Sequence, residues 1–223
     1  EVADEAGFQV VVSDMHNSPH FSDNAVSALL SMHVDGVIIA AEVPEQHQLG
    51  IDVPFVTIGE RHYVNPQSDL VYGDNTAGMR LAIEHLTSLG HTKIVHVTSF
   101  DGIGAKRRDA YEKYMVEFGL KPWVVGYGQP ATEIGGYLMA KELLQSKAKF
   151  TAIATENDAQ AAGVWAVLKE HGIRVPEDVS LIGYDNSPIT SDYFLKLTTI
   201  DEMGIQIGRE AAKILLDRMN NNS

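Results

Sequence analysis

The sequence predicts an α/β protein with parallel sheets. Short apolar, β-branched segments alternate along the chain with helical segments of about 10 to 15 residues. The helical segments begin at Asn or Asp caps and end just before a glycine, and the strands end in polar turn formers. This alternation is typical of right-handed βαβ units, in which helices cover both faces of a sheet.

The first third of the chain contains one clear βαβ unit. Residues Glu1 to Ala6 match the last turn of a helix that Gly7 ends, and the apolar run from Phe8 to Val12 predicts a strand. The next predicted elements are a helix with apolar positions 25, 26, 29 and 30 and strands at 36–40, 55–58 and 70–72.

The helix and strand signals become more regular after Gly73. Asp74 or Asn75 caps a helix whose apolar positions recur at spacings of three and four until Gly90. The remaining predicted elements are strand 94–97, a helix around 107–118, strand 123–125, helix 132–144, strand 152–154, a helix from 157 to Gly172, strand 179–184 and helix 203–219.

Composition excludes several classes of protein. The chain has 223 residues, of which 44% are hydrophobic and 21% charged, so it predicts a globular protein rather than a disordered one. No apolar run approaches the roughly 20 residues of a membrane span, and the start resembles no secretory signal. A net charge of −13 disfavours nucleic-acid binding, and the lack of cysteine excludes disulfides and fits a cytoplasmic location.

Enzyme and cofactor motifs are not expected in this chain. Residues 126–131 match G-x-G-x-x-A, but Pro130 removes a backbone N–H from the loop that would cradle a pyrophosphate. No P-loop occurs, and no nucleophile, base and orienting group arise together. We therefore expect a chain without a cofactor, a metal or catalytic activity.

Polar residues at strand ends are the candidates for ligand contact, because open parallel sheets bind ligands beyond the carboxyl ends of their strands. Asp185 and Asn186 follow strand 179–184, although an Asx turn would explain them equally well. Asn157 follows strand 152–154 and could simply cap the next helix. Arg107 near a helix start opposes the helix dipole, which favours a distant acidic or hydroxyl partner.

Five segments of the chain form a recognisable set. They are Asp74–Gly78 (DNTAG), Glu84–His91 (EHLTSLGH), Ile153–Ala159 (IATENDA), Arg174–Asp185 (RVPEDVSLIGYD) and Leu197–Ile200 (LTTI). Together they resemble the effector-binding domain of the lactose repressor/galactose repressor family of bacterial transcription regulators. They occur in the family's order, and the resemblance covers essentially the whole chain.

The resemblance implies two Rossmann-like, parallel-sheet subdomains that flank a ligand cleft, the periplasmic-binding-protein-like fold. One subdomain would comprise residues 1–73 plus 201–223 and form a homodimer, and the other residues 74–200. The implied function is to sense a small effector, most simply a sugar, and so to control operator binding by a DNA-binding headpiece. The implied ligand-binding residues are Gly59, Glu60, Arg107, Asn157, Asp185 and Glu202.

The chain departs from the family pattern in three ways. The DNA-binding headpiece is expected to lie outside it, and so are the first strand and most of the first helix of the N-terminal subdomain. Ala131 stands where many members place an aromatic that stacks on the ligand, which counts against a flat purine. Glu202 stands where a neutral Gln is common, which makes the cleft more acidic. A periplasmic sugar-binding protein of a transport system is the alternative function.

Overall fold

The computed structural model describes residues 1–13, 23–40, 50–59, 69–99, 102–126, 128–190 and 195–221. The chain forms two compact units. Unit 1 comprises Glu1–Gly73 and Met203–Ser223, and unit 2 comprises Asp74–Glu202. Asp201 and Glu202 thus belong to unit 2, whereas the sequence placed them with the first subdomain.

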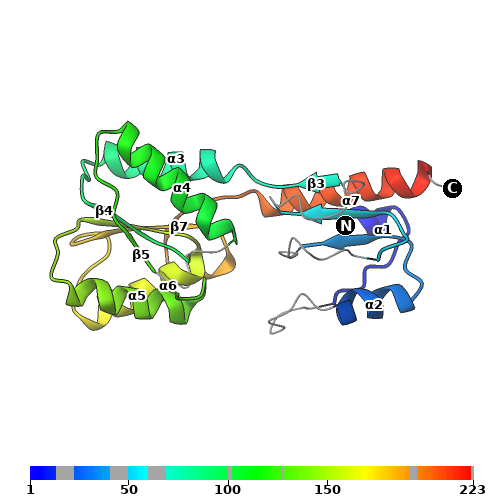
Figure 1. The fold of residues 1–223 in the computed structure, drawn as a ribbon, viewed down its shortest axis with the longest axis horizontal. Coiled ribbons are helices and arrows are strands. Elements are labelled where there is room, and N and C mark those ends of the chain that lie inside the picture. Colours follow the sequence, from blue (N-terminus) through cyan, green and yellow to red (C-terminus); the bar gives the residue numbers. More distant parts are fainter. Residues whose placement is uncertain are drawn as a thin grey trace. The chain divides into compact units, whose positions relative to one another are not determined.

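Unit 1 contains a parallel three-stranded sheet with strand order β1-β2-β3 (Figure 1). Helix α2 packs on one face through Leu30, and helix α7 packs on the other through Ala211 and Leu215. The apolar stripes of the two helices therefore enclose a small core around β2. The elements of unit 1 are α1 (Val2–Glu5), α2 (Asp23–Ser31), β1 (Val37–Ile39), β2 (Phe55–Ile58), β3 (Asp69–Val71) and α7 (Gly204–Asn221).

The strand predicted from Phe8 to Val12 is wrong. These residues form no strand, and the side chains of Val10 and Val12 are 71% and 85% exposed. A strand needs a neighbour to complete its hydrogen-bond ladder, and the ladders of this sheet join only β1, β2 and β3 within the described ranges. High β-propensity at Phe8–Val12 therefore does not produce a strand by itself.

Unit 2 contains a parallel five-stranded sheet with strand order β5-β4-β6-β7-β8, so the predicted α/β class with parallel sheets is confirmed. The order reverses at β4, because β4 pairs with β5 on one side and with β6 on the other. The strands of unit 2 are β4 (Ile94–Val97), β5 (Val124–Val125), β6 (Ala152–Thr155), β7 (Ser180–Tyr184) and β8 (Thr198–Ile200). Its helices are α3 (Asn75–Ser88), α4 (Gly102–Glu117), α5 (Glu133–Gln145), α6 (Asp158–Glu170) and the 3₁₀ turn η1 (Pro188–Thr190).

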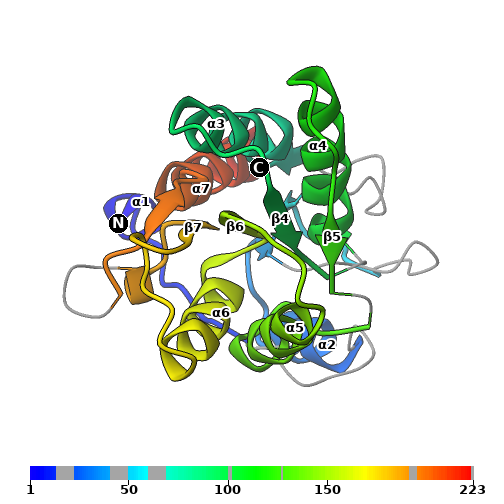
Figure 2. The same cartoon turned by 90° about the vertical axis from the view of Figure 1, so that its left-hand side faces the viewer.

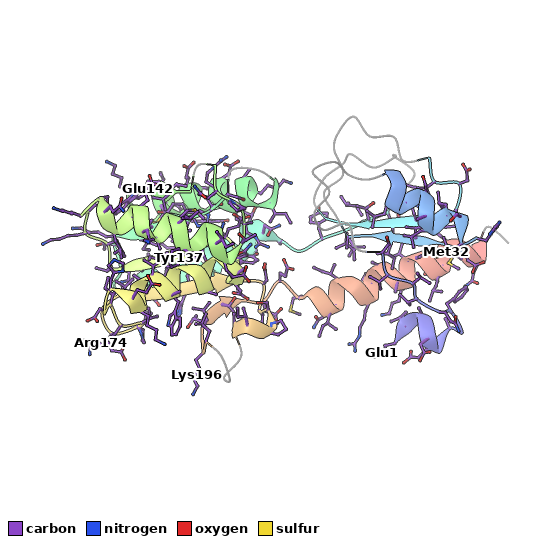
Figure 3. All side chains as sticks on the ribbon, turned by 90° about the horizontal axis from the view of Figure 1, so that it is seen from below. Glu1, Met32, Tyr137, Glu142, Arg174 and Lys196 are labelled. Carbon is purple, nitrogen blue, oxygen red and sulfur yellow. The ribbon has the colours of Figure 1, made fainter. Side chains whose placement is uncertain are left out.

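Two helical layers cover the sheet of unit 2. Figure 2 shows α3 and α4 on one face and α5 and α6 on the other. Alternate residues of each strand enter the two cores: Ile94 packs under α3 and α4, and Val95 packs under α5 and α6. Tyr137 lies between α5 and α6 (Figure 3), where its hydroxyl donates to Glu170 Oε2 at 3.0 Å. None of the helices in the described ranges is long and apolar enough to cross a membrane.

One helix start and one strand in unit 2 differ from the prediction. Helix α4 begins at Gly102, so Arg107 lies in its second turn and not at its start. Strand β8 was not predicted, because three partly exposed residues have no periodic pattern of their own. It forms because Ile182, Gly183 and Tyr184 of β7 supply the ladder.

Helices α5 and α6 approach each other closely at two glycines. A Cβ added at Gly163 would lie 2.0 Å from the carbonyl oxygen of Glu133, and one added at Gly136 would lie 2.1 Å from the carbonyl oxygen of Gln160. Both obstacles are backbone atoms, which cannot rotate away. Residues without a side chain are therefore required at both positions for this helix pair to pack.

We predict that Gly163→Ala destabilises unit 2 by about 1–3 kcal/mol, because α5 and α6 must separate to admit the methyl group. Both tryptophans, Trp123 and Trp165, belong to unit 2, so denaturant unfolding followed by tryptophan fluorescence reports on that unit.

The matched control is Gly208→Ala in α7, where nothing lies within 4 Å of the added methyl. Alanine favours the helix there by about 1 kcal/mol. Because Gly208 belongs to unit 1, the denaturant midpoint reported by the tryptophans of unit 2 should not change. A Gly163→Ala variant as stable as the wild type would contradict the close approach.

Candidate functional site

Polar side chains of unit 2 gather at the carboxyl ends of its parallel strands. Glu156 follows β6, Asp185 follows β7, and Glu202 lies just beyond β8. Arg107 reaches the same place from the second turn of α4. We call the group of Asn75, Glu156, Tyr184, Asp185 and Glu202 around Arg107 the carboxyl-edge site.

Arg107 is the centre of the carboxyl-edge site, and its side chain is only 3% exposed. Nη1 donates to Asp185 Oδ1 at 2.9 Å and to the carbonyl oxygen of Glu156 at 2.6 Å. Nη2 donates to Glu202 Oε2 at 3.0 Å, and Nε donates to Asn75 Oδ1 at 2.7 Å. The sequence predicted a distant acidic or hydroxyl partner for this arginine, and the structure provides two acidic ones, Asp185 and Glu202.

The face of the guanidinium group lies over an aromatic ring. Arg107 Cζ is 3.6 Å from the centroid of the Tyr184 ring, a cation–π contact in a buried environment. On α3, a Cβ at Gly78 would lie 2.0 Å from the Tyr184 hydroxyl oxygen. The glycine of the DNTAG segment therefore leaves room for the ring on which Arg107 rests.

Asp185 turns the chain sharply at the end of β7. Its φ is 109° and that of Asn186 is 56°, both in the left-handed region that side chains disfavour. The Asp185 N–H donates to the carbonyl oxygen of Ile200 at 2.8 Å, which ties the turn to β8. Strained backbone at an acidic residue is common at functional sites, and here it directs the carboxylate to Arg107.

The environment of Asp185 favours its protonated form. Burial raises the pKa of this carboxyl to about 7, although the Arg107 guanidinium opposes the shift. The carboxylates of Glu202 and Asp158 add to the rise by repulsion. The charge of the carboxyl-edge site therefore changes near neutral pH.

Glu156 holds the start of α4 in place. Its Oε2 accepts from the Ser99 N–H at 2.5 Å and from Thr98 Oγ1 at 3.2 Å, and its Oε1 accepts from Ser99 Oγ at 3.0 Å. A Cβ at Gly104 would lie 2.7 Å from both carboxylate oxygens. The side chain of Glu156 thus orients the helix that carries Arg107, and its carbonyl oxygen binds the guanidinium directly.

Asp158 joins the segment that follows β7 to strand β8. Its Oδ2 accepts from the Ser187 N–H at 2.7 Å and its Oδ1 accepts from Thr199 Oγ1 at 2.6 Å. Burial raises the pKa of this carboxyl, and the two hydrogen bonds lower it. Asp158 thereby positions the turn that presents Asp185.

The structure brings together three of the six predicted ligand-binding residues, namely Arg107, Asp185 and Glu202. Asn157 lies at the same edge of the sheet, where its Oδ1 caps α6 by accepting from the Gln160 N–H at 2.8 Å. Its Nδ2 also donates to the carbonyl oxygen of Ala131 at 3.0 Å. Asn157 is therefore a helix cap, as one interpretation of the sequence held, and its ligand contact stays a prediction.

The other two predicted residues follow β2 in unit 1. Gly59 has a φ of 140°, a conformation that favours glycine, and its N–H donates to the carbonyl oxygen of Val71 at 3.0 Å. Glu60 lies outside the described residues. The ligand contacts of both rest on the family resemblance.

The sequence did not reveal Asn75, Tyr184 and Glu156 as members of the site. Asn75 was considered only as a helix cap, a role that Asp74 performs by accepting from the Ala77 N–H. Tyr184 was assigned to a buried strand. Glu156 could have been noticed, because an acidic residue directly after a buried strand at this edge is unusual. In the described ranges, no cluster of three or more His, Asp or Glu residues could hold a metal ion.

We predict that Asp185→Asn removes part of the pH dependence of the stability of unit 2. Between its ordinary pKa of 3.8 and about 7, Asp185 is protonated in the folded chain and ionised in the unfolded chain. The folded wild type therefore binds the extra proton, and its stability relative to the variant increases as pH falls from about 7 to about 4. Denaturant titrations at pH 5, 6, 7 and 8, followed by tryptophan fluorescence, measure this difference.

Asp178→Asn is the control for this prediction. Asp178 accepts from Arg174 Nη2 at 2.8 Å, which holds its pKa at about 2. Its substitution changes the pH dependence only below about pH 4, because the stabilising ionised form is lost there. If the free energy of unfolding changes equally with pH in the wild type and in Asp185→Asn between pH 5 and 7, the raised pKa of Asp185 is refuted.

Comparison with known proteins places the chain in a family. A model of the periplasmic binding protein-like domain matches residues 83–223. The HTH-type transcriptional repressor PurR of Haemophilus influenzae strain PittEE is 32% identical over 222 residues, which cover 96% of this chain and 65% of the repressor. The chain thus spans about two thirds of the length of this relative.

Solved structures give the same assignment. A LacI-family transcriptional regulatory protein from Corynebacterium glutamicum is 36% identical, with a TM-score of 0.86 over 100% of this chain and 82% of that one. A LacI family transcriptional regulator from Enterococcus faecalis V583 with bound ribose is 25% identical, with a TM-score of 0.82 over 98% of this chain and 82% of that one. These relatives are transcription regulators and not enzymes, which confirms the non-enzymatic prediction. The chain belongs to the LacI family and has the periplasmic binding protein-like fold of that family's effector-binding domain.

Proposed function

We propose that this chain is the effector-sensing part of a bacterial transcription regulator and that it binds a neutral, hydroxyl-rich small molecule, a sugar, at the carboxyl-edge site. The observation that carries the proposal is the state of Arg107. Four of its five N–H groups donate to acceptors among the described residues. The arginine therefore has little capacity left to recognise an anion.

The acidic partners of Arg107 offer hydrogen-bond acceptors to a ligand. Asp185 and Glu202 each contact Arg107 through one carboxylate oxygen, and their side chains are 32% and 36% exposed. The second oxygen of each carboxylate accepts no hydrogen bond from the described part of the chain. Such acceptors suit a ligand that supplies several donors, and sugar hydroxyls do so.

The balance of charge at the site also disfavours anionic ligands. Above about pH 7, where Asp185 is ionised, two negative carboxylates, Asp185 and Glu202, face a single guanidinium group, so a phosphorylated sugar would add like charge to an acidic site. Ala131 lies beside Asn157, which donates to its backbone carbonyl oxygen. The methyl side chain of Ala131 is too small to stack on a flat ring. These features favour a neutral sugar over a sugar phosphate or a purine.

The regulatory role rests on the family. LacI-family relatives respond to small-molecule effectors, form dimers and bind operator DNA. We infer that this chain acts in the same way in the cytoplasm, in a homodimer formed through residues 1–73 and with operator DNA bound by a headpiece outside residues 1–223. A periplasmic sugar-binding protein is not favoured, because the matched relatives are transcription regulators.

Isothermal titration calorimetry tests the ligand class. The panel contains D-ribose, D-glucose and D-galactose as neutral sugars, glucose 6-phosphate as an anion, and hypoxanthine because the relatives include the purine-responsive PurR. We expect one of the neutral sugars to bind, and Asp185→Ala and Arg107→Ala each to weaken it by tenfold or more. The first change removes an acceptor for the sugar hydroxyls, and the second removes the group that holds both carboxylates in place.

Asp109→Ala is the matched control for both substitutions. Asp109 lies on the same helix as Arg107, but its side chain is 67% exposed, and its carboxylate accepts from Arg108 Nη2 at 2.8 Å. This variant should bind the sugar as the wild type does. Binding of glucose 6-phosphate or hypoxanthine alone would overturn the proposed ligand class, and sugar binding unaffected by both site variants would overturn the proposed site.

Sedimentation velocity tests the homodimer. We expect the sedimentation coefficient to rise with protein concentration toward the value for a dimer, because LacI-family relatives dimerise. A single monomeric species over the range from about 1 to 100 μM would contradict the proposed dimer, with 1 μM corresponding to about 8 kcal/mol of association energy.

A further inference from the structure

Arg107 binds residues at both ends of unit 2. The chain passes between the two units at two points, after Gly73 and after Glu202. Asn75 lies next to the first crossing, and Glu202 is the last residue before the second. Arg107 donates to the side chains of both residues, at 2.7 and 3.0 Å.

The first crossing is held through the start of α3. Asp74 caps this helix by accepting from the Ala77 N–H at 2.9 Å, and the Gly78 N–H donates to the carbonyl oxygen of Asp74 at 2.9 Å. Asn75 is therefore fixed in the first turn and is 6% exposed. Its amide oxygen accepts from Arg107 Nε, so the first turn of α3 and the guanidinium group restrain each other.

The second crossing is held through the end of β7. The Asp185 N–H donates to the carbonyl oxygen of Ile200, and Asn186 Nδ2 donates to Asp201 Oδ2 at 3.1 Å. Glu202 then binds Arg107, and the next residue, Met203, has a left-handed φ of 64°. The contacts of Arg107 with Asp185 and Glu202 therefore restrain the last residues before the chain leaves unit 2.

We propose that Asn75 is a positioning residue for Arg107 and that Arg107 couples the two crossings, so that loosening one loosens the other. Asn75 orients the guanidinium through Nε, which leaves Nη1 and Nη2 aligned with the two carboxylates. The stacked Tyr184 ring prevents the group from tilting. The side chains of Asn75, Tyr184, Asp185 and Glu202 all contact Arg107, so the network is continuous within unit 2.

This coupling gives the site a means of regulation, and that part of the proposal rests on the proposed function. A ligand that donates to Asp185 and Glu202 competes with Arg107 for the same carboxylates. Binding thus changes the restraint on Glu202 directly and on Asn75 through Arg107. Because coupling between two equilibria is reciprocal, a change at Asn75 must also alter the affinity for such a ligand.

Hydrogen exchange measured by mass spectrometry on the full chain without ligand tests the coupling. In Asn75→Ala, which removes one hydrogen bond to Arg107, we expect peptides over residues 198–204 to exchange about fivefold faster. In Glu202→Gln, whose side chain is partly exposed, we expect the reciprocal effect in peptides over residues 72–78. Peptides over residues 133–170 should exchange as in the wild type and show that each variant is folded.

Thr76→Ala is the matched control, because Thr76 is exposed in the same helical turn. It should leave residues 198–204 unchanged. Arg107→Lys keeps the charge and loses the planar fork, so Asn75→Ala in that background should no longer affect the second crossing.

The possible outcomes separate this proposal from the proposed function. The coupling is overturned, whatever the chain binds, if Asn75→Ala and Glu202→Gln each speed exchange only at the crossing nearest the substituted residue. Coupled exchange in a chain that binds none of the calorimetric panel would support the coupling and refute the proposed ligand. When a sugar does bind, its affinity in Asn75→Ala should differ from the wild type by several-fold, and an equal affinity would refute the link to regulation.

Discussion

A buried guanidinium group must be neutralised and hydrogen-bonded by the fold around it, and Arg107 imposes this requirement on unit 2. An arginine cannot lose its proton, so burial is tolerated only where acceptors meet nearly every N–H group. Two carboxylates, one side-chain amide and one backbone carbonyl do so here, and they come from four separate segments of the chain. One side chain therefore joins the first turn of α3, the ends of β6 and β7 and the segment after β8 at this edge of the sheet.

The recurring sequence segments of the chain are parts of a single packed arrangement. Gly183 of RVPEDVSLIGYD has no side chain because a Cβ there would lie 2.2 Å from Asp158 Oδ1. Asp158 belongs to IATENDA, and its carboxylate accepts from Thr199 of LTTI. Gly78 of DNTAG leaves room for the ring of Tyr184. Residues far apart in sequence are thus matched in size and in hydrogen bonding, which explains why these residue types occur together.

The acidity of the carboxyl-edge site links its chemistry to its position. Burial raises the pKa of Asp185, and the neighbouring Glu202 carboxylate adds to the rise. Arg107 donates to both carboxylates. A neutral residue at position 202 would remove this negative charge and weaken the bond from Arg107 Nη2. The charge of this one residue therefore influences both the kind of ligand that fits and the restraint on the end of unit 2.

Local sequence determined the elements whose signals are local. The helix that Asp74 caps, the apolar strands β4, β6 and β7, and the α/β class follow from periodicity, capping and turn residues, since each of these depends on neighbours a few positions away. The resemblance of five segments to one family likewise needed no coordinates. Residue types and their order were sufficient to select Arg107, Asp185 and Glu202 as residues of interest.

Only the tertiary structure decided which of these residues meet and which strands form. Phe8–Val12 has the composition of a strand and no ladder partner in the described sheet, whereas Thr198–Ile200 lacks a strand pattern and pairs with β7. Asn75 and Tyr184 became members of the site because the fold places them around the guanidinium group of Arg107. Hydrogen-bond ladders and the neutralisation of a buried charge depend on distant segments, and no local pattern in the sequence encodes the distance between them.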